Sequence, residues 1–337
     1  MGRIKGLVLL FPALALFASV SLSGCGETYP KEKVNESVVK ICKDEYNVDV
    51  KVESLGKTMA IYLPLEDLMD FTFSINKDAS EKINDVILSV ARVVLSTDAD
   101  FNYYCVIAHD VRIPEIQIVI IKSVEDVKRL LLNDISRGEY SKRVLIDLRL
   151  NPQSQKERSV RDVFSKMSLD EKWQEQMMND FFRAEPTGLG DIGYWGGKFY
   201  IKDVTKPEFL AEQMASRIKM DFKEAKALAD AFTLKAAKGS YVASPEGNKY
   251  FKLEVLAEPK WFKDTTMSEA SDKLFRAVLE IAGVVAHSYG FDDFGYVEIV
   301  DQACVKTIRV PKDDLEKLRT KRLSTKICLP WRRLKEG

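Results

Sequence analysis

Two stretches of this chain, 191 positions apart, carry the same pattern. Residues 79–94 read ASEKINDVILSVARVV, and residues 270–285 read ASDKLFRAVLEIAGVV. Each begins with Ala, Ser, an acidic residue and Lys, and then places apolar residues at the spacing of one helix face. The pattern therefore predicts two long amphipathic helices. The shared opening residues favour a tandem duplication over the alternative, two unrelated helices whose apolar positions coincide.

The flanking sequence extends the likeness. Asp100, Phe101 and Tyr103 follow the first stretch, and Asp293, Phe294 and Tyr296 follow the second with a slip of two residues. Apolar runs with strand-like composition lie on both sides of each predicted helix. In the first copy we expect a helix over 37–46, strands over 48–52 and 59–63, a long helix capped by Asp78, strands over 103–108 and 116–121, and a helix capped by Ser123. Pro64 is expected to end the second of these strands.

The second copy repeats this order. We expect a strand over 249–256, a long helix from Ser268, strands over 296–300 and 304–310, and a charged helix from 312 or 313. Between the copies we expect a charged helical stretch over 158–182, a Gly-rich passage, a strand over 198–202, and one or two helices within 209–232.

These elements predict an α+β fold of two tandem units. Each unit consists of a helix, a hairpin, a long helix, two strands and a helix, with mostly antiparallel sheets that carry helices on one face. The strands alternate enough that the other sheet face is expected to be less covered. The expected boundaries are a first unit over 34–150, a helical and Gly-rich connector over 151–205, a second unit over 206–330, and a basic tail over 331–337.

The N-terminus has the features of an export signal. Arg3 and Lys5 precede an uncharged apolar stretch that runs to Leu22 and is short for a membrane span. The sequence Leu22-Ser23-Gly24-Cys25 resembles the lipobox of bacterial lipoproteins, and this resemblance covers about the first 25 residues. It implies that a signal peptide of residues 1–24 is removed, that Cys25 is lipidated with diacylglycerol and acyl chains such as palmitate, and that residues 25–33 form a tether.

The same resemblance implies a location. The protein is expected at the cell membrane or the outer membrane, facing the periplasm or the exterior. Gly26 follows the lipidated cysteine, where Asp resembles an inner-membrane retention signal, so the outer membrane is favoured if the cell has one. The membrane is then an expected partner, to which the protein is attached through the lipidated Cys25.

Composition narrows the function classes. The 51 basic residues balance the 51 acidic residues, which argues against a nucleic-acid-binding protein. His109 and His287 are the two histidines, and the later cysteines contain no C-x-x-C pair, so a zinc site is not expected. Those cysteines are Cys42, Cys105, Cys304 and Cys328; they are either buried thiols or, in an exported chain, disulfides.

The Gly-rich passage is the one candidate site. Residues 188–193 spell G-x-G-x-x-G, but a dinucleotide site needs a strand before this string and a helix after it. Here a helical stretch precedes it and a strand follows, so no cofactor is expected. Tyr194 and Trp195 on this loop are candidates for contacting a partner, because aromatic side chains supply large contact areas. The alternative is that Trp195 folds inward and fills the gap between the two units.

No catalytic motif is found. His109 and His287 lack a nucleophile on a strained turn, and the acidic pairs at 98/100 and 292/293 are typical of solvated turns. The sequence therefore favours a non-enzymatic envelope lipoprotein that binds an envelope protein or polymer. The rival hypothesis is an envelope-acting enzyme whose active site lies between the two units.

Overall fold

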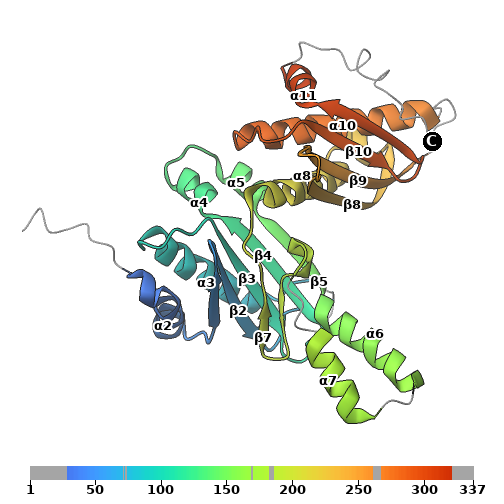
Figure 1. Ribbon diagram of the computed structural model, residues 1–337. Helices are drawn as coiled ribbons and strands as arrows, with labels where there is room; N and C mark the ends of the chain where they lie inside the picture. The colour runs from blue at the N-terminus through green and yellow to red at the C-terminus, as the bar shows by residue number, and fades with distance from the viewer. Residues whose placement is uncertain are drawn as a thin grey trace, which may run out of the picture.

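The computed structural model describes residues 29–320, apart from 71, 73, 168–169, 182–185 and 261–266 (Figure 1). Cys25, the signal peptide, Cys328 and the basic tail therefore lie outside the described residues. Within them the protein has an α+β fold built from two sheet–helix units.

The first unit is a five-stranded sheet with helices. In chain order its elements are η1 (Lys31–Lys33), α2 (Val34–Tyr46), β1 (Lys51–Leu55), β2 (Thr58–Leu65), α3 (Lys77–Leu95), β3 (Tyr103–Asp110), β4 (Ile116–Ser123), α4 (Val124–Leu131), α5 (Arg137–Arg143) and β5 (Leu145–Leu150). The strands lie in the order β1-β2-β3-β4-β5. Only β2 and β3 run parallel, because α3 crosses between them.

The second unit repeats the topology of the first without counterparts of α5 and β5. Its elements are α8 (Lys206–Glu224), α9 (Lys226–Ala229), β8 (Phe232–Ala243), β9 (Lys249–Pro259), α10 (Met267–Ser288), β10 (Tyr296–Asp301), β11 (Lys306–Pro311) and α11 (Lys312–Arg319). Its four strands lie in the order β8-β9-β10-β11, and the single parallel pair, β9 with β10, is again connected by the long helix. The predicted fold class is thus confirmed, and the order of elements is consistent with a tandem repeat.

Individual bonds recur in the two units. Asn102 N–H donates to the Lys57 carbonyl, and Gly295 N–H donates to the Lys249 carbonyl at the matching strand junction. At the same places, Lys57 Nζ pairs with Asp100 and Lys249 Nζ pairs with Asp293. This is the register that the shared Asp-Phe-x-Tyr pattern predicts.

The two long helices are buried along the predicted stripe with three exceptions, of which Ala91 of α3 is half-buried and the other two lie in α10. Ile83, Val86, Ile87 and Val90 are buried in α3, as are Leu274, Val278 and Ile281 in α10, whereas Ala277 is half-buried. Val93 is buried, but its counterpart Val284 is 51% exposed. The two helices therefore share a sequence register but not every packing partner.

The connector holds two hairpins of different kinds. Helices α6 (Pro152–Met167) and α7 (Glu171–Phe181) form a helical hairpin, here called the arm, which projects from the body at the lower right of Figure 1. After the short η2 (Leu189–Asp191), β6 (Gly193–Trp195) and β7 (Lys198–Tyr200) form a small antiparallel hairpin.

The first sheet separates two hydrophobic cores. Tyr104, Val106 and Ala108 of β3 point into the core made with α2, α3 and α4. Tyr103 and Cys105 point to the other side, into a core shared with β6, α8 and the second unit. The expectation of a less covered sheet face is therefore wrong for the first sheet. In the second sheet it is right, since Tyr250, Lys252 and Glu254 are only half-buried on the outer face.

Several local expectations are also corrected. The long helix begins at Lys77, and Asn76 rather than Asp78 caps it by accepting the Asp78 N–H. Pro64 lies inside β2, which is possible because β1 stops pairing at Tyr62 and no neighbour on that side needs the missing N–H. The first strand lies at 51–55 instead of 48–52, and α5, β5, β6 and β8 were not expected.

The tether is also shorter than the sequence suggested. Tyr29 N–H donates to the Ser96 carbonyl at 3.2 Å, and Tyr29 forms a parallel bridge with Thr97. Lys31–Lys33 is a 3-10 helix. The chain is therefore attached to the folded body from Tyr29 onwards, and not from residue 34.

Candidate functional site

Tyr194, one of the two predicted contact residues, is part of the core. It is 6% exposed, and its ring stacks on that of Tyr62 with the centroids 3.7 Å apart. Its hydroxyl accepts a hydrogen bond from Lys51 Nζ at 2.8 Å. The expectation of an exposed residue is wrong here, because alternation along β6 turns Tyr194 onto the first sheet.

Trp195, the other predicted residue, is partly accessible, as expected. Its Nε1–H donates to Glu157 Oε2 of α6 at 2.7 Å. Burial alone raises the pKa of Glu157, but the hydrogen bonds from Trp195 and Arg161 outweigh it and hold that pKa below its usual range. Trp195 therefore fixes the base of the arm to the small hairpin and does not fill a gap between the units.

The glycines of this segment serve turns and close packing. Gly196 and Gly197 form the turn of the small hairpin with φ of +56° and +81°, a backbone region that favours glycine. A Cβ on Gly193 would come within 2.9 Å of the Gln117 side chain. The segment continues into a strand and not a helix, as predicted, so the G-x-G-x-x-G string lacks the helix N-terminus that a dinucleotide needs.

His109 has a structural environment. Its Nε2–H donates to the Pro114 carbonyl at 2.8 Å, so its Nδ1 accepts from the Tyr62 hydroxyl at 3.0 Å. Both ring nitrogens are thereby used by the protein. Burial lowers the pKa of this histidine, which is held neutral between Tyr62 and the loop after β3.

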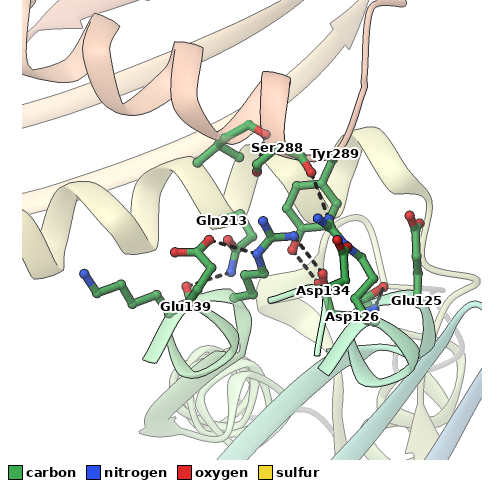
Figure 2. A network of polar contacts seen from close by, with 12 residues as sticks. Glu125, Asp126, Asp134, Glu139, Gln213, Ser288 and Tyr289 are labelled. Carbon is green, nitrogen blue, oxygen red and sulfur yellow. Dashed lines mark hydrogen bonds and ion pairs between the residues drawn. The ribbon is translucent and has the colours of Figure 1, made fainter. Parts of the chain in front are cut away.

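The two units meet through a buried polar network, drawn in Figure 2. Arg143 Nη1 donates to Asp126 Oδ1 at 2.9 Å, and the Tyr289 hydroxyl donates to the other carboxylate oxygen. The Arg143 guanidinium also lies over the Tyr289 ring, 4.7 Å from its centroid. Glu139 accepts from both Arg143 and Arg217 of α8.

This network fills the place where the rival hypothesis put an active site. Arg143 and Asp126 are each 3% exposed or less, and their charged groups bond to one another. Burial raises the pKa of Asp126, although Tyr289 and Arg143 act against it. Burial raises the pKa of Tyr289 as well. The paired charges hold one unit against the other, so these side chains already have bonding partners within the protein.

The described cysteines are free thiols. Cys42 and Cys105 are buried, and Cys304 is partly exposed. Burial raises the pKa of Cys105 to about 12, so its thiol stays protonated and inert. Within the described ranges no group of three or more His, Cys, Asp and Glu side chains is arranged to hold a metal ion.

The edge strand β5 exposes a row of apolar side chains. Ile146, Leu148 and Leu150 alternate with Asp147 and Arg149, and they are 61%, 47% and 54% exposed. They pair across β4 with Ile120, Ile118 and Ile116 in turn, and so they extend the apolar face of the first sheet past the helices that cover it. We call these three residues the β5 strip.

The β5 strip continues onto the arm. Leu150 and Val160 of α6 line the same open hollow of about 700 Å³, with Arg149 and Lys156 at its polar side. Val163 and Met167 follow Val160 at helical spacing and are 51% and 61% exposed.

On the second helix of the arm, α7, Trp173 and Met177 are 62% and 46% exposed. We call Val163, Met167, Trp173 and Met177 the arm stripe. The β5 strip and the arm stripe together form a candidate docking surface.

Sequence reasoning missed this surface for a clear reason. The apolar spacing along the arm was visible, but amphipathic helices normally bury such a stripe, and nothing in the sequence says that this one has no cover. The alternation in Leu145–Leu150 was also a usable strand signal. The alternation does not show that β5 lies at the edge of the sheet.

The comparisons with known proteins give no identity. No protein-family model matches the chain, and no curated protein or solved structure matches it either. Among the helices of the described residues, none is long and apolar enough to span a membrane.

Proposed function

We propose that this protein is a lipid-anchored, non-enzymatic binding module of the cell envelope, facing the periplasm or the exterior. Cys25 holds it at the membrane, and the docking surface made of the β5 strip and the arm stripe binds an envelope protein. The exposure of these seven apolar side chains on one edge of the first unit and its arm is the observation that carries the proposal.

The short spacing between Cys25 and Tyr29 is consistent with an anchor at Cys25. Only Gly26, Glu27 and Thr28 separate Cys25 from Tyr29, which is bonded to the folded body. Four residue steps of about 3.5 Å span at most about 14 Å. Lipidation at Cys25 would therefore keep the first unit close to the bilayer surface, and two or more acyl chains would make that attachment durable.

The composition of the docking surface suits a protein partner. Soluble proteins that act alone rarely expose large contiguous apolar patches, and such patches commonly mark interaction sites. Trp and Met are enriched at protein interfaces, since both supply large contact areas and Met adapts its shape. Helix α6 also carries the exposed cations Lys156, Arg158 and Arg161, which suit the polar rim of an interface.

The anchor is tested with Cys25→Ser in the full-length protein. Metabolic labelling with a clickable fatty acid should label the wild type and a Cys304→Ser control, while Cys25→Ser should give an unlabelled, uncleaved precursor. A labelled Cys25→Ser protein at the mature mass would contradict the anchor.

The docking surface is tested with Leu148→Glu against Leu88→Glu. Leu88 is 60% exposed on α3 and lies outside the surface, so it controls for the loss of an exposed leucine. Both variants should keep the wild-type melting temperature. After in vivo cross-linking and quantitative mass spectrometry, envelope proteins recovered with the wild type and with Leu88→Glu should be at least tenfold depleted with Leu148→Glu. Equal recovery with all three proteins would overturn the docking proposal.

A further inference from the structure

Most of the described side chains of the arm are exposed. Its base is held by the contacts of α6 with β6 and η2, and by the bond from Trp195 to Glu157. Beyond the base, Figure 1 shows α6 and α7 packed alongside one another and projecting from the body. Two antiparallel helices alone can bury only the seam between them.

The seam and the exposed stripe can be told apart. Phe164 of α6 is 6% exposed, so α6 has a buried side as well as an exposed one. Val163 and Met167 are one helical turn apart on α6, and Trp173 and Met177 are one turn apart on α7. All four stay about half exposed or more, so each helix presents apolar side chains that the other does not cover. Such a hairpin is half of a four-helix bundle.

The charges of the two helices favour a second copy of the arm as the partner that completes the bundle. Helix α6 carries four basic and two acidic residues, whereas α7 carries one basic and three acidic residues. In a two-fold symmetric pair of arms, α6 of one copy can pack against α7 of the other, and the reverse contact is then identical. Each such contact joins a net positive helix to a net negative helix, so the arm is complementary to itself.

A membrane surface fits the arm less well. The opposite charges of α6 and α7 cancel over the arm, which leaves no net attraction to anionic lipid. Figure 1 also places the arm on the opposite side of the first unit from α2, the element next to the attachment at Tyr29. For the arm to lie on the lipid, two opposite sides of the first unit would have to contact the bilayer at the same time.

We propose that the arm stripe binds the arm of a second copy of this chain, and that the two arms form an antiparallel four-helix bundle. The inference deepens the proposed function by assigning the arm-stripe part of the docking surface to a second copy of this chain, and it rests on that function only in treating the arm as a docking surface. Copies anchored in one membrane present their arms at the same height, which raises their effective concentration and favours this pairing. The β5 strip then remains open for a different partner.

The first test uses the full-length protein in its native membrane. A photo-cross-linking amino acid at Met177 should give a covalent species of twice the monomer mass. The same amino acid at Leu132, which is 79% exposed on the first unit outside the arm, should not. Adding Trp173→Ser to the Met177 probe should lower the dimer yield at least tenfold, because a central tryptophan often dominates an interface. A Met177 adduct only to lipid, to this chain's own C-terminal segment or to a different protein would overturn the proposal.

A charge exchange provides a second test that does not depend on removing apolar residues. Arg158→Glu with Arg161→Glu makes both helices of the arm acidic, and Glu171→Lys with Glu175→Lys makes both basic. Each double variant should lose the cross-linked dimer when expressed alone, since its arms repel one another. Co-expression of the two should restore a dimer that contains one copy of each. Dimers that persist in either variant alone, or no recovery on co-expression, would contradict pairing of α6 with α7.

The two proposals fail in different ways. Loss of partner with Leu148→Glu together with no dimer at Met177 would leave the proposed function standing and remove only the pairing of arms. A dimer at Met177 with no effect of Leu148→Glu would support the pairing and remove the β5 strip from the proposed function.

Discussion

Asp110 and Asp301 cap equivalent turns in the two units, although Asp301 comes two residues earlier in its strand when Tyr103 is aligned with Tyr296. Each ends a central strand, and each uses Oδ1 to accept two backbone N–H groups of the following turn, at residues 112 and 113 in one unit and 303 and 304 in the other. The second oxygen has diverged: Asp110 Oδ2 accepts the Leu68 N–H, and Asp301 Oδ2 accepts the Ser271 hydroxyl. The feature that the two units share is thus the carboxylate-capped turn.

This divergence predicts a difference between two equivalent serines. Ser271→Ala should lower the free energy of unfolding by about 1 kcal/mol, because it leaves one oxygen of a buried carboxylate without its partner. Ser80→Ala, at the matching position of α3, should cost less, since Asp110 is satisfied by a backbone N–H. Urea denaturation of both variants measures this. Equal losses would show that the two turns do not differ as described.

The network between the units should be a main source of stability. Arg143→Ala should cost about 3–5 kcal/mol, because Asp126 would remain buried without its counter-charge. Tyr289→Phe removes one hydrogen bond to that carboxylate and should cost about 1.5–3 kcal/mol. Arg92→Ala, which breaks the exposed pair with Glu45, should change stability far less. Similar effects of all three in denaturant unfolding would contradict a structural role for the network.

Val305 is strained. It has φ of +53° in the turn between β10 and β11, a conformation that costs an L-residue about 1–2 kcal/mol, and its side chain is 79% exposed. Val305→Asn should therefore stabilise the protein by about 1 kcal/mol, measured as a higher urea midpoint. Val111→Asn, at a half-exposed loop valine without positive φ, is the control and should give no gain. If Val305→Asn is neutral or destabilising, the turn is not strained at that residue.

His109 predicts a pH dependence. Its pKa is lowered in the folded protein, while the unfolded chain has the ordinary value of about 6.5. Below that pH the unfolded state binds more protons, so the free energy of unfolding should fall as pH decreases from about 6.5 towards the lowered pKa, by at most about 1.4 kcal/mol per unit of pKa shift. His109→Gln should flatten this step between pH 5 and 7, and His287→Gln, at an exposed site, should leave it unchanged. A step that survives His109→Gln must come from another group.

Substitutions at Tyr194 and Trp195 should lower the free energy of unfolding by different amounts. Tyr194→Ala removes a buried ring stacked on Tyr62 and should cost about 3–5 kcal/mol. Trp195→Phe removes the bond to Glu157 and should cost about 1 kcal/mol, while loosening the base of the arm. Calorimetry and denaturant unfolding check both. An unaffected Tyr194→Ala protein would mean that the residue is not part of the core.

Local patterns predicted the repeated architecture well. The 3.6-residue spacing in the two long helices, the Ser123 cap and the shared Asp-Phe-x-Tyr segments all depend on contacts close in sequence. The candidate site could not be predicted in the same way. Tyr194 and Trp195 are adjacent on one strand, so one of them must point inward, and only the docking of β6 on the first sheet decides which.

The sequence by itself determined which segments are amphipathic, in what order the elements of each unit follow, and the lipobox-like start that the anchor proposal rests on. Only the tertiary structure decided what covers each apolar face. It buries Tyr194 against Tyr62, joins the units through Asp126, Arg143 and Tyr289, and leaves the β5 strip and the arm stripe exposed. The physical reason is that spacing fixes where an apolar stripe lies on an element, whereas burial depends on which distant element packs against it.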